Sequence, residues 1–547
     1  MGTHPSKDSR IAAERRLATE ALLAELTALV TPSQLPGQSH ALPLPSPLST
    51  NLLHRHATPY LHLLPTHASQ IPPLIRLART HELRITVRST GSSFSGYGTT
   101  DRGLLLDLSR LRDVKLNRKD NTNEVESVSC GGGATWGDIN RALVDGCCEG
   151  WVPNGPRGDG SEGVVGFLLG GGLGVWSRFA GMGCDSVVQW TVVTAAGELV
   201  TVSEKDGKDT KEGRLFWALR GGGLGGLVVV VGVRLRMVKV PERVVAGRWA
   251  GRADEKLNEA VDQRWYAIPW ADQTTVDTHW TVSTPGPSTP TVRFVATHAG
   301  AKSDFDSFVD RVVQPVVPDL AGKLKTHTIS EPTTLFLHET LAELHRETAA
   351  PFQPGHQSYL AYASFVFHHF EKGTAIGVEY ADEALQAFQE QFIDDAATLE
   401  LSWLHGGGGA ISRLSADNTA FPWRSGVFFV QVSLRWHDKF LSAKIGTFLD
   451  GLSATMRSIS IQQKAALVTL AGDGQEEGYQ QAFYGGNYAK LQVVKQEWDP
   501  EDYFHVPRGI RLPGVKLEGT VDEVNGRDGV PWRELGERQW RSRGESV

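Results

Sequence analysis

The sequence predicts an α+β protein built from two structural units, and three observations lead to this prediction. Glycine contributes 59 of 547 residues, about 11% against a usual share near 7%, and it gathers at 131–133, 155–174 and 221–232. Apolar runs of strand length separate these clusters. After Pro241 the pattern changes to strands that alternate with long helices, which is typical of an antiparallel sheet backed by helices.

The first unit is expected over residues 51–240. Residues 9–30 before it place apolar side chains on one helical face, and a proline-rich connector follows at 35–49, so 1–50 are assigned to a helix and a connector. Within the unit, the apolar patterns predict helices at 70–81, 135–145 and 215–219, and strands at 83–88, 104–108, 124–130, 187–195, 198–202 and 227–235.

The second unit is expected over residues 241–475. Its patterns predict strands at 265–270, 291–297, 359–367 and 427–435, and helices at 303–313 and 380–395. Beyond it, the segment 476–520 holds one apolar-rich stretch at 483–499, and 521–547 form a polar tail.

Charge and hydropathy exclude two classes of partner. The chain has 55 basic and 62 acidic residues, a net charge of −7, which argues against a nucleic-acid-binding protein. No uncharged stretch reaches the roughly 20 apolar residues of a membrane span. Residues 1–16 carry charges of both signs, unlike a signal peptide. We therefore expect a cytoplasmic protein that binds neither nucleic acid nor membrane, unless a leader has been removed.

Cysteine and histidine positions predict no metal site. The four cysteines form no C-x-x-C pair, so we interpret them as buried thiols. The histidine pairs at 54/56 and 368/369 have no cysteine or carboxylate at ligand spacing.

The stretch VRSTGSSFSGYG at 87–98 directly follows a predicted strand. Small residues at Ser89, Thr90, Gly91, Ser92 and Ser93 leave backbone N–H groups uncovered, and their hydroxyls add donors. This composition is typical of a nest for phosphate or pyrophosphate.

The second glycine-rich stretch, SEGVVGFLLGGGLG at 161–174, combines an apolar face with six glycines. It could lie flat against a planar ring and donate N–H bonds to it. Each loop alone could be ordinary tight turns, but the two together favour a nucleotide cofactor. GGGLGG at 221–226 contains a formal G-x-G-x-x-G, yet it follows a helix and precedes a strand, the reverse of the dinucleotide fingerprint.

In order, these motifs resemble the berberine-bridge-enzyme-like flavoproteins, which have the vanillyl-alcohol-oxidase (PCMH-type) FAD-binding fold. The motifs that carry the resemblance are ITVRSTGSSFSG (85–96), LLLDLSRL (104–111), GGGATWGDI (131–139), the 161–174 loop, GCDSV (183–187), LFWALRGGG (215–223), HGGGGAISRLSADNTAFPWRSGVFFVQVSLRW (405–436) and FYGGNYAKLQVVKQEWDPEDYF (483–504). The resemblance implies a two-part FAD domain, 51–240 with 476–520, around a substrate domain at 241–475.

The resemblance also assigns cofactor-binding residues. Ser89, Thr90, Gly91, Ser92 and Ser93 would hold the FAD pyrophosphate. The residues that would line or pack on the rest of FAD are Ser161, Gly163, Val164, Gly166, Phe167, Gly171, Gly174, Val228 and, from the C-terminal segment, Asn487. Asp185 matches an acidic position after the second loop, where a structural cap is an equally good interpretation.

Departures from the family pattern change the expected mechanism. The position of the usual flavin-attaching histidine is Ser92, and that of the attaching cysteine is Asp159, so FAD should be bound noncovalently. Two positions that often carry aromatic hydroxyls are Leu470 and Ala180. The family's base position is Gln431, whose amide does not titrate and which we interpret as an orienting catalytic residue.

These departures predict a mostly apolar substrate pocket and leave three functions open. The favoured one is an FAD-dependent oxidoreductase on a small, mostly apolar molecule, with O2 as a candidate electron acceptor and a place in secondary metabolism. The alternative is a cyclase or isomerase that closes a ring pericyclically on the same scaffold, because folding a substrate into a reactive shape needs no base. The third is a ligand-binding protein with a degenerate site.

Overall fold

The computed structural model describes residues 51–514 except 56, 58, 60, 94, 101–102, 120–123, 253–256, 258–260, 262, 288, 345–357, 370–371 and 471–477, together with residues 25 and 29. The predicted N-terminal helix and the polar tail therefore lie outside the described residues, apart from Glu25 and Leu29, which are helical.

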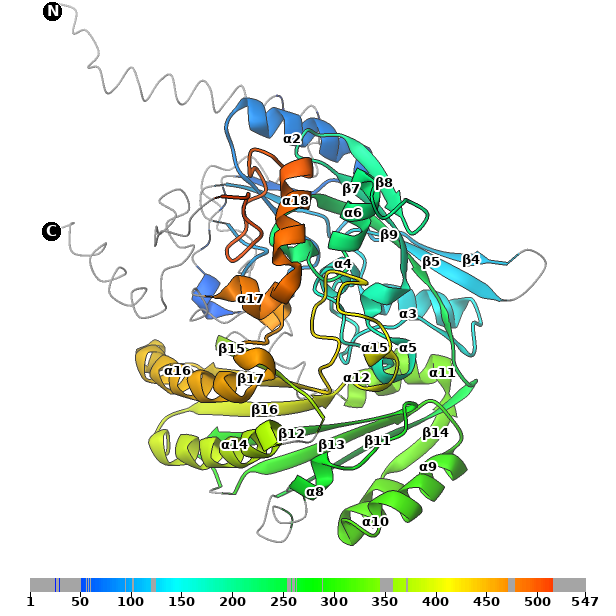
Figure 1. The fold of residues 1–547 in the computed structure, drawn as a ribbon, viewed down its shortest axis with the longest axis vertical. Helices are drawn as coiled ribbons and strands as arrows, with labels where there is room; N and C mark the ends of the chain where they lie inside the picture. The colour runs from blue at the N-terminus through cyan, green and yellow to red at the C-terminus, as the bar shows by residue number, and fades with distance from the viewer. Residues whose placement is uncertain are drawn as a thin grey trace, which may run out of the picture.

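Two small sheets form the upper part of the molecule in Figure 1. Three parallel strands pair in the order β1 (Leu61–Leu63), β3 (Leu104–Asp107) and β2 (Ile85–Arg88). Five antiparallel strands pair in the order β4 (Val114–Arg118), β5 (Val125–Gly131), β9 (Val229–Arg236), β7 (Val187–Val193) and β8 (Leu199–Ser203). The strands β6 (Trp151–Val152) and β10 (Val238–Lys239) form a further short pair.

Two of the helices around these sheets begin at a threonine whose side chain caps the helix, Thr135 and Thr210. The helices are α2 (Ile71–Thr80), α3 (Trp136–Asp145), α4 (Val164–Leu169), α5 (Ser177–Ala180) and α6 (Lys211–Ala218). Thr135 caps α3, because its hydroxyl accepts a hydrogen bond from the amide of Asp138 while the Asp138 carboxylate accepts one from the Thr135 amide at 2.8 Å. The capping box fixes this helix directly after the glycine turn at 131–133.

A seven-stranded antiparallel sheet forms the lower part in Figure 1. Its strands in order are β14 (Thr328–Pro332), β11 (Arg243–Arg252), β13 (Thr291–His298), β12 (Thr274–Thr284), β16 (Ala397–His405), β17 (Phe428–Trp436) and β15 (Tyr359–Phe367). The helices α9 (Lys302–Phe308), α10 (Pro318–Thr326), α14 (Lys372–Gln391) and α16 (Ser442–Ile459) cover one face. This confirms the predicted α+β class with an antiparallel sheet backed by helices.

Alternation along these strands separates a helix-packed face from a free face. Side chains such as Leu401, Val432 and Leu434 are fully buried in the core beneath the helices. Because successive strand residues point to opposite faces, the residues between them point away from the helices, toward the first unit. That second face becomes one wall of the cavity described below.

One predicted strand is wrong. Residues 265–270 contain the end of a short helix, α8 (Gln263–Tyr266), and the strand of this region begins only at Thr274. Trp265, Tyr266 and Trp270 are all buried in the core beneath the sheet, so consecutive apolar residues here report a buried turn and not an alternating strand.

The C-terminal segment returns to the first unit. It forms α17 (Tyr479–Tyr484) and α18 (Tyr488–Trp498), and α18 packs beside α6 (Figure 1). The fully buried ammonium of Lys495 bonds the Asp499 carboxylate at 2.7 Å and the backbone carbonyl of Gly226 at 2.7 Å. This buried ion pair ties the last helix to the loop before β9.

Candidate functional site

A cavity of about 560 Å³ lies between the two units, within the usual size range of small-molecule sites. Six parts of the chain supply most of its lining: the loop after β2, the segment from Pro156 through α4 to Leu173, residues 223–230, the free face of the seven-stranded sheet, residues 467–470 and residues 504–508. The cavity therefore joins residues that are up to about 450 positions apart in the sequence.

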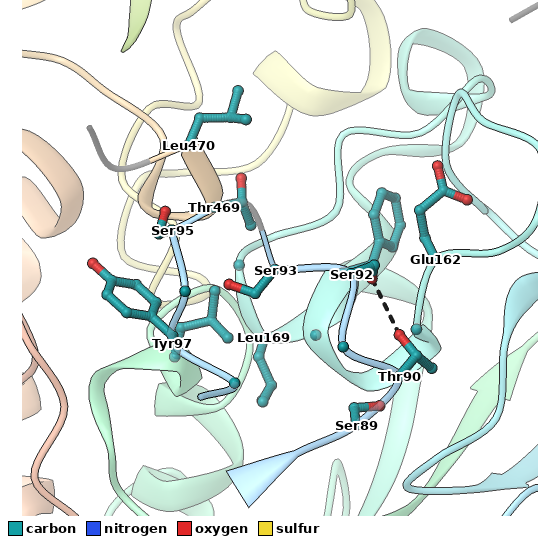
Figure 2. A pocket seen from close by; sticks show the side chains of 18 of the residues that line it. Ser89, Thr90, Ser92, Ser93, Ser95, Tyr97, Glu162, Leu169, Thr469 and Leu470 are labelled. Carbon is teal, nitrogen blue, oxygen red and sulfur yellow. Dashed lines mark hydrogen bonds between the residues drawn. The ribbon is translucent and has the colours of Figure 1, made fainter. Parts of the chain in front are cut away.

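The loop after β2 presents free backbone donors. Among the described residues, the amides of Thr90, Gly91, Ser92 and Ser93 have no backbone partner. The loop keeps its shape through a hydrogen bond between the Thr90 and Ser92 hydroxyls at 3.1 Å (Figure 2). Gly91 has φ +85°, a left-handed conformation that glycine adopts without strain. The arrangement matches the anion nest that the sequence predicts.

Two glycines of the segment at α4 shape the side of the cavity next to this loop. A Cβ on Gly163 would approach the Thr90 hydroxyl oxygen to 2.9 Å and the Ser89 hydroxyl oxygen to 3.0 Å. A Cβ on Gly166 would meet nothing within 4 Å, and Gly166 lines the cavity. The first glycine permits close packing of the loops, and the second leaves an uncovered backbone surface on which a flat group can lie.

Most of the predicted site residues line the cavity. They are Ser89, Thr90, Gly91, Ser92, Ser93, Ser161, Gly163, Gly166, Phe167, Val228 and Gln431, together with Asp159 and Leu470. The uncovered amides and the open glycine fit an FAD molecule, and neither Ser92 nor Asp159 offers a side chain of the type that attaches flavin in the family.

The structure places four predicted cofactor residues elsewhere. Val164 is fully buried in the core of the first unit, and Gly171 and Gly174 do not line the cavity. The Asn487 amide nitrogen donates to the backbone carbonyl of Ala416 at 2.9 Å, so its side chain fastens the 416–420 loop. The prediction that Asn487 reaches the flavin is therefore corrected.

Asp185 has the structural role that was the alternative interpretation. Its carboxylate accepts two hydrogen bonds from Arg424, both at 2.7 Å, and one from the Met182 amide at 2.8 Å. Both charged side chains are nearly inaccessible, at 10% and 3% exposure. This bidentate pair joins the first unit to the loop before β17 and does not line the cavity.

Besides Gln431, the sheet wall carries polar side chains that the sequence analysis did not single out. Antiparallel register places His279, Ser402 and Gln431 in one row across β12, β16 and β17. The next row holds Glu400 and Ser433, with Tyr362 on β15. All six line the cavity. The predicted apolar pocket thus describes only the wall that includes Leu470 and Leu467.

Glu400 is ionised at neutral pH. Burial by itself raises the pKa of this carboxyl, but the His279 side chain 3.6 Å away, the charge of Arg293 and the Ser402 hydroxyl together hold it below its ordinary value. The pKa of the Tyr362 phenol is raised well above its ordinary value by burial and by the nearby Glu400 charge. Tyr362 therefore remains protonated.

Glu162 lies beside the loop after β2 and also lines the cavity. Burial, with a smaller contribution from the Asp159 charge, raises the pKa of its carboxyl to about 7. Its Oε2 atom is buried and accepts no hydrogen bond from the described residues. The group therefore exchanges a proton near neutral pH.

Metal and membrane features are not found in the described part of the chain. No group of three or more histidine, cysteine, aspartate or glutamate residues there could hold a metal ion. No helix among the described residues has the length and apolar character needed to cross a bilayer.

Two family models match the chain, one described as FAD binding domain over residues 59–203 and one as Berberine and berberine like over residues 471–511. The FAD-linked oxidoreductase easE of Claviceps purpurea (strain 20.1) is 24% identical over 488 residues, covering 86% of this chain and 95% of that protein. Glucooligosaccharide oxidase of Sarocladium strictum is 25% identical, covering 81% and 85%. Berberine bridge enzyme-like 12 of Arabidopsis thaliana is 25% identical, covering 83% and 84%.

Solved structures share the fold. The grass pollen allergen Phl p 4, which has glucose dehydrogenase activity, superimposes with a TM-score of 0.73 at 20% identity, covering 90% of this chain and 99% of that one. Berberine bridge enzyme from Eschscholzia californica superimposes with a TM-score of 0.72 at 20% identity, covering 90% and 100%.

Proposed function

Because the chain is an FAD-linked oxidoreductase of the berberine-bridge-enzyme-like family, we propose that it binds FAD noncovalently and oxidises a small molecule in the cavity. The observation that carries the proposal is the pair of cavity-lining residues Ser92 and Asp159, which replace the two residues that attach flavin in the family. Bound FAD would supply the hydride acceptor.

Noncovalent retention is energetically reasonable. The free amides of residues 90–93 are donors for the pyrophosphate, and the open surface at Gly166 accommodates a ring. Nanomolar affinity corresponds to about −12 kcal/mol, which a large cofactor reaches without a covalent bond.

The residues that line the cavity would exclude water from the substrate and position it. The apolar wall with Leu467 and Leu470 excludes water from one side of the substrate, and the sheet wall orients its polar groups. The Gln431 amide both donates and accepts hydrogen bonds but cannot take up a proton, so it positions the substrate. Dioxygen is the proposed final electron acceptor.

A visible spectrum before and after acid precipitation tests the proposal. We expect purified protein to show flavin absorbance and the supernatant to hold all of the flavin after precipitation. Flavin that stays with the pellet would contradict noncovalent binding, and protein that neither carries nor takes up FAD would contradict the proposed function.

Ring closure without net oxidation is the second candidate, motivated by Leu470 and Ala180. It predicts an isomeric product of unchanged mass formed without oxygen and without lasting bleaching of the flavin. A substrate that bleaches the 450 nm band under anaerobic conditions and gives a product two hydrogens lighter would exclude it.

A further inference from the structure

The sheet wall of the cavity contains a hydrogen-bonded chain that ends on a carboxylate. The Ser402 hydroxyl donates to Glu400 Oε1 at 3.1 Å, and His279 Nδ1 lies 2.8 Å from the same hydroxyl oxygen. Because a hydroxyl has one proton, His279 Nδ1 must be the donor to Ser402. The order is therefore His279 to Ser402 to Glu400.

This series of hydrogen bonds leaves the second oxygen of the Glu400 carboxylate available. Among the described residues, no hydrogen bond reaches Glu400 Oε2, although the side chain is only 17% exposed and lines the cavity. The side chain of His279 is 2% exposed, so the supporting end of the chain is closed to solvent while the carboxylate end faces the cavity.

The other carboxyl groups on the cavity belong to the segment that packs against the loop after β2, and not to the sheet wall. Among the described lining residues these are Asp159 and Glu162. Asp159 Oδ1 accepts a hydrogen bond from the Ser161 amide at 2.9 Å at an exposed point of this segment, and Glu162 directly precedes Gly163, which packs on the Ser89 and Thr90 side chains of the proposed FAD-binding loop. Gln431, adjacent to Ser402 in the sheet register, does not titrate.

We propose that Glu400 is the catalytic proton acceptor for a substrate hydroxyl, with Ser402 and His279 as positioning residues, so that the substrate is an alcohol. The inference rests on the proposed function, which supplies FAD as the oxidant. The carbinol C–H bond breaks and its hydride goes to the flavin, the O–H bond breaks and its proton goes to Glu400 Oε2, and the C=O bond forms. Two electrons leave the substrate and two enter the flavin.

The charged and titratable groups around Glu400 come from every neighbouring strand. They are His279 on β12, Arg293 on β13, Tyr362 on β15 and Arg435 on β17. Loss of one hydrogen bond to the carboxylate makes its ionised form less stable. Removal of the Ser402 hydroxyl should therefore shift the acid limb of the reaction to higher pH.

The test uses the FAD-loaded full chain and follows reduction of the flavin by anaerobic stopped flow. The electron donors are benzyl alcohol, cinnamyl alcohol, glucose and cellobiose, and benzylamine is the comparison donor without a hydroxyl group. Glu400→Gln keeps the shape of the side chain and removes its basicity. We expect a fall in the reduction rate of about 10²- to 10⁴-fold, with unchanged FAD content. Glu390→Gln, at an exposed position on α14, is the matched control and should behave as wild type.

Two further readouts do not rely on measuring the activity of Glu400→Gln. In Ser402→Ala, the acid limb of the reduction rate should move upward in pH, which a merely structural serine would not cause. NMR of protein labelled with [δ-13C]glutamate should show one carboxyl, missing in Glu400→Gln, that titrates below the ordinary glutamate value and shifts upward in Ser402→Ala.

Three results would overturn the inference: wild-type rates in Glu400→Gln, reduction by benzylamine but by none of the alcohols, or a Glu400 carboxyl that is protonated at pH 7. Failure of the proposed function looks different, because the protein would then take up no FAD or no donor would reduce it.

Discussion

The protonation of Glu162 should make FAD affinity depend on pH. Its carboxyl has a pKa of about 7 in the protein without cofactor, raised by burial and by Asp159. FAD in the cavity would remove still more water and add negative phosphate charge, and both effects favour the protonated acid. FAD should therefore bind the neutral form, and affinity should fall as pH rises above 7.

The size of the effect follows from the pKa. About ten in eleven carboxyls are protonated at pH 6 and about one in eleven at pH 8, so the apparent Kd should rise about tenfold over this range, equivalent to about 1.4 kcal/mol. Glu162→Gln keeps a neutral side chain of the same shape at every pH. Its Kd should stay near the wild-type value at pH 6 and lose this dependence.

The assay is titration of the apoprotein with FAD, followed by quenching of flavin fluorescence between pH 6 and 8. Glu390→Gln, exposed on α14, controls for the general loss of one acid and should keep the wild-type slope. The reasoning is refuted if Glu162→Gln shows the same tenfold change as wild type, or if wild-type affinity is constant across the range.

Four further substitutions, one of them a control, test the site and the contacts that support it. Gly166→Leu should abolish FAD binding by filling the open surface, without unfolding the apoprotein. Gly322→Ala on α10, also with nothing within 4 Å of a new Cβ, should leave FAD binding intact and stabilise the fold by roughly 0.5–1 kcal/mol. FAD titration measures the binding of both variants, and thermal melts measure their stability. Asp185→Asn should lower the free energy of unfolding by about 3–5 kcal/mol because Arg424 stays buried without its partner, and chemical denaturation that finds no loss would count against it. Ser92→His should restore an attachment residue, so that some flavin remains with the acid precipitate; complete release would argue that position 92 lies away from the flavin ring.

The cofactor cradle could be predicted from local sequence because its chemistry is mainly backbone chemistry. Glycines and hydroxyl residues at 89–93 uncover amides whatever the rest of the chain does, and Gly163 and Gly166 mark the approach of a second segment. The same local pattern could not tell that Val164, Gly171 and Gly174 do not line the cavity. The direction of the Val164 side chain depends on how α4 is rotated against its neighbours, and the positions of the two glycines depend on the path of the chain after that helix.

The seven-stranded sheet could be predicted in type but not in order. Alternating apolar residues at 359–367 and 427–435 indicate strands with one buried face, and both are confirmed. The prediction of a strand at 265–270 is wrong. Aromatic residues that are buried in a short helix and turn give the same run of apolar residues as a buried strand.

The sequence by itself determined that glycine-rich loops would present backbone donors, that an antiparallel sheet would follow, and that the usual flavin-attaching residues are replaced at 92 and 159. Only the tertiary structure decided which polar side chains meet in the cavity. His279, Tyr362, Glu400 and Gln431 come from four strands spread over more than 150 residues, and only Gln431 could be singled out within its own segment. They share one wall because the hydrogen-bond register between the strands places their side chains side by side on the face that the helices leave free. This register depends on contacts between residues far apart in the sequence.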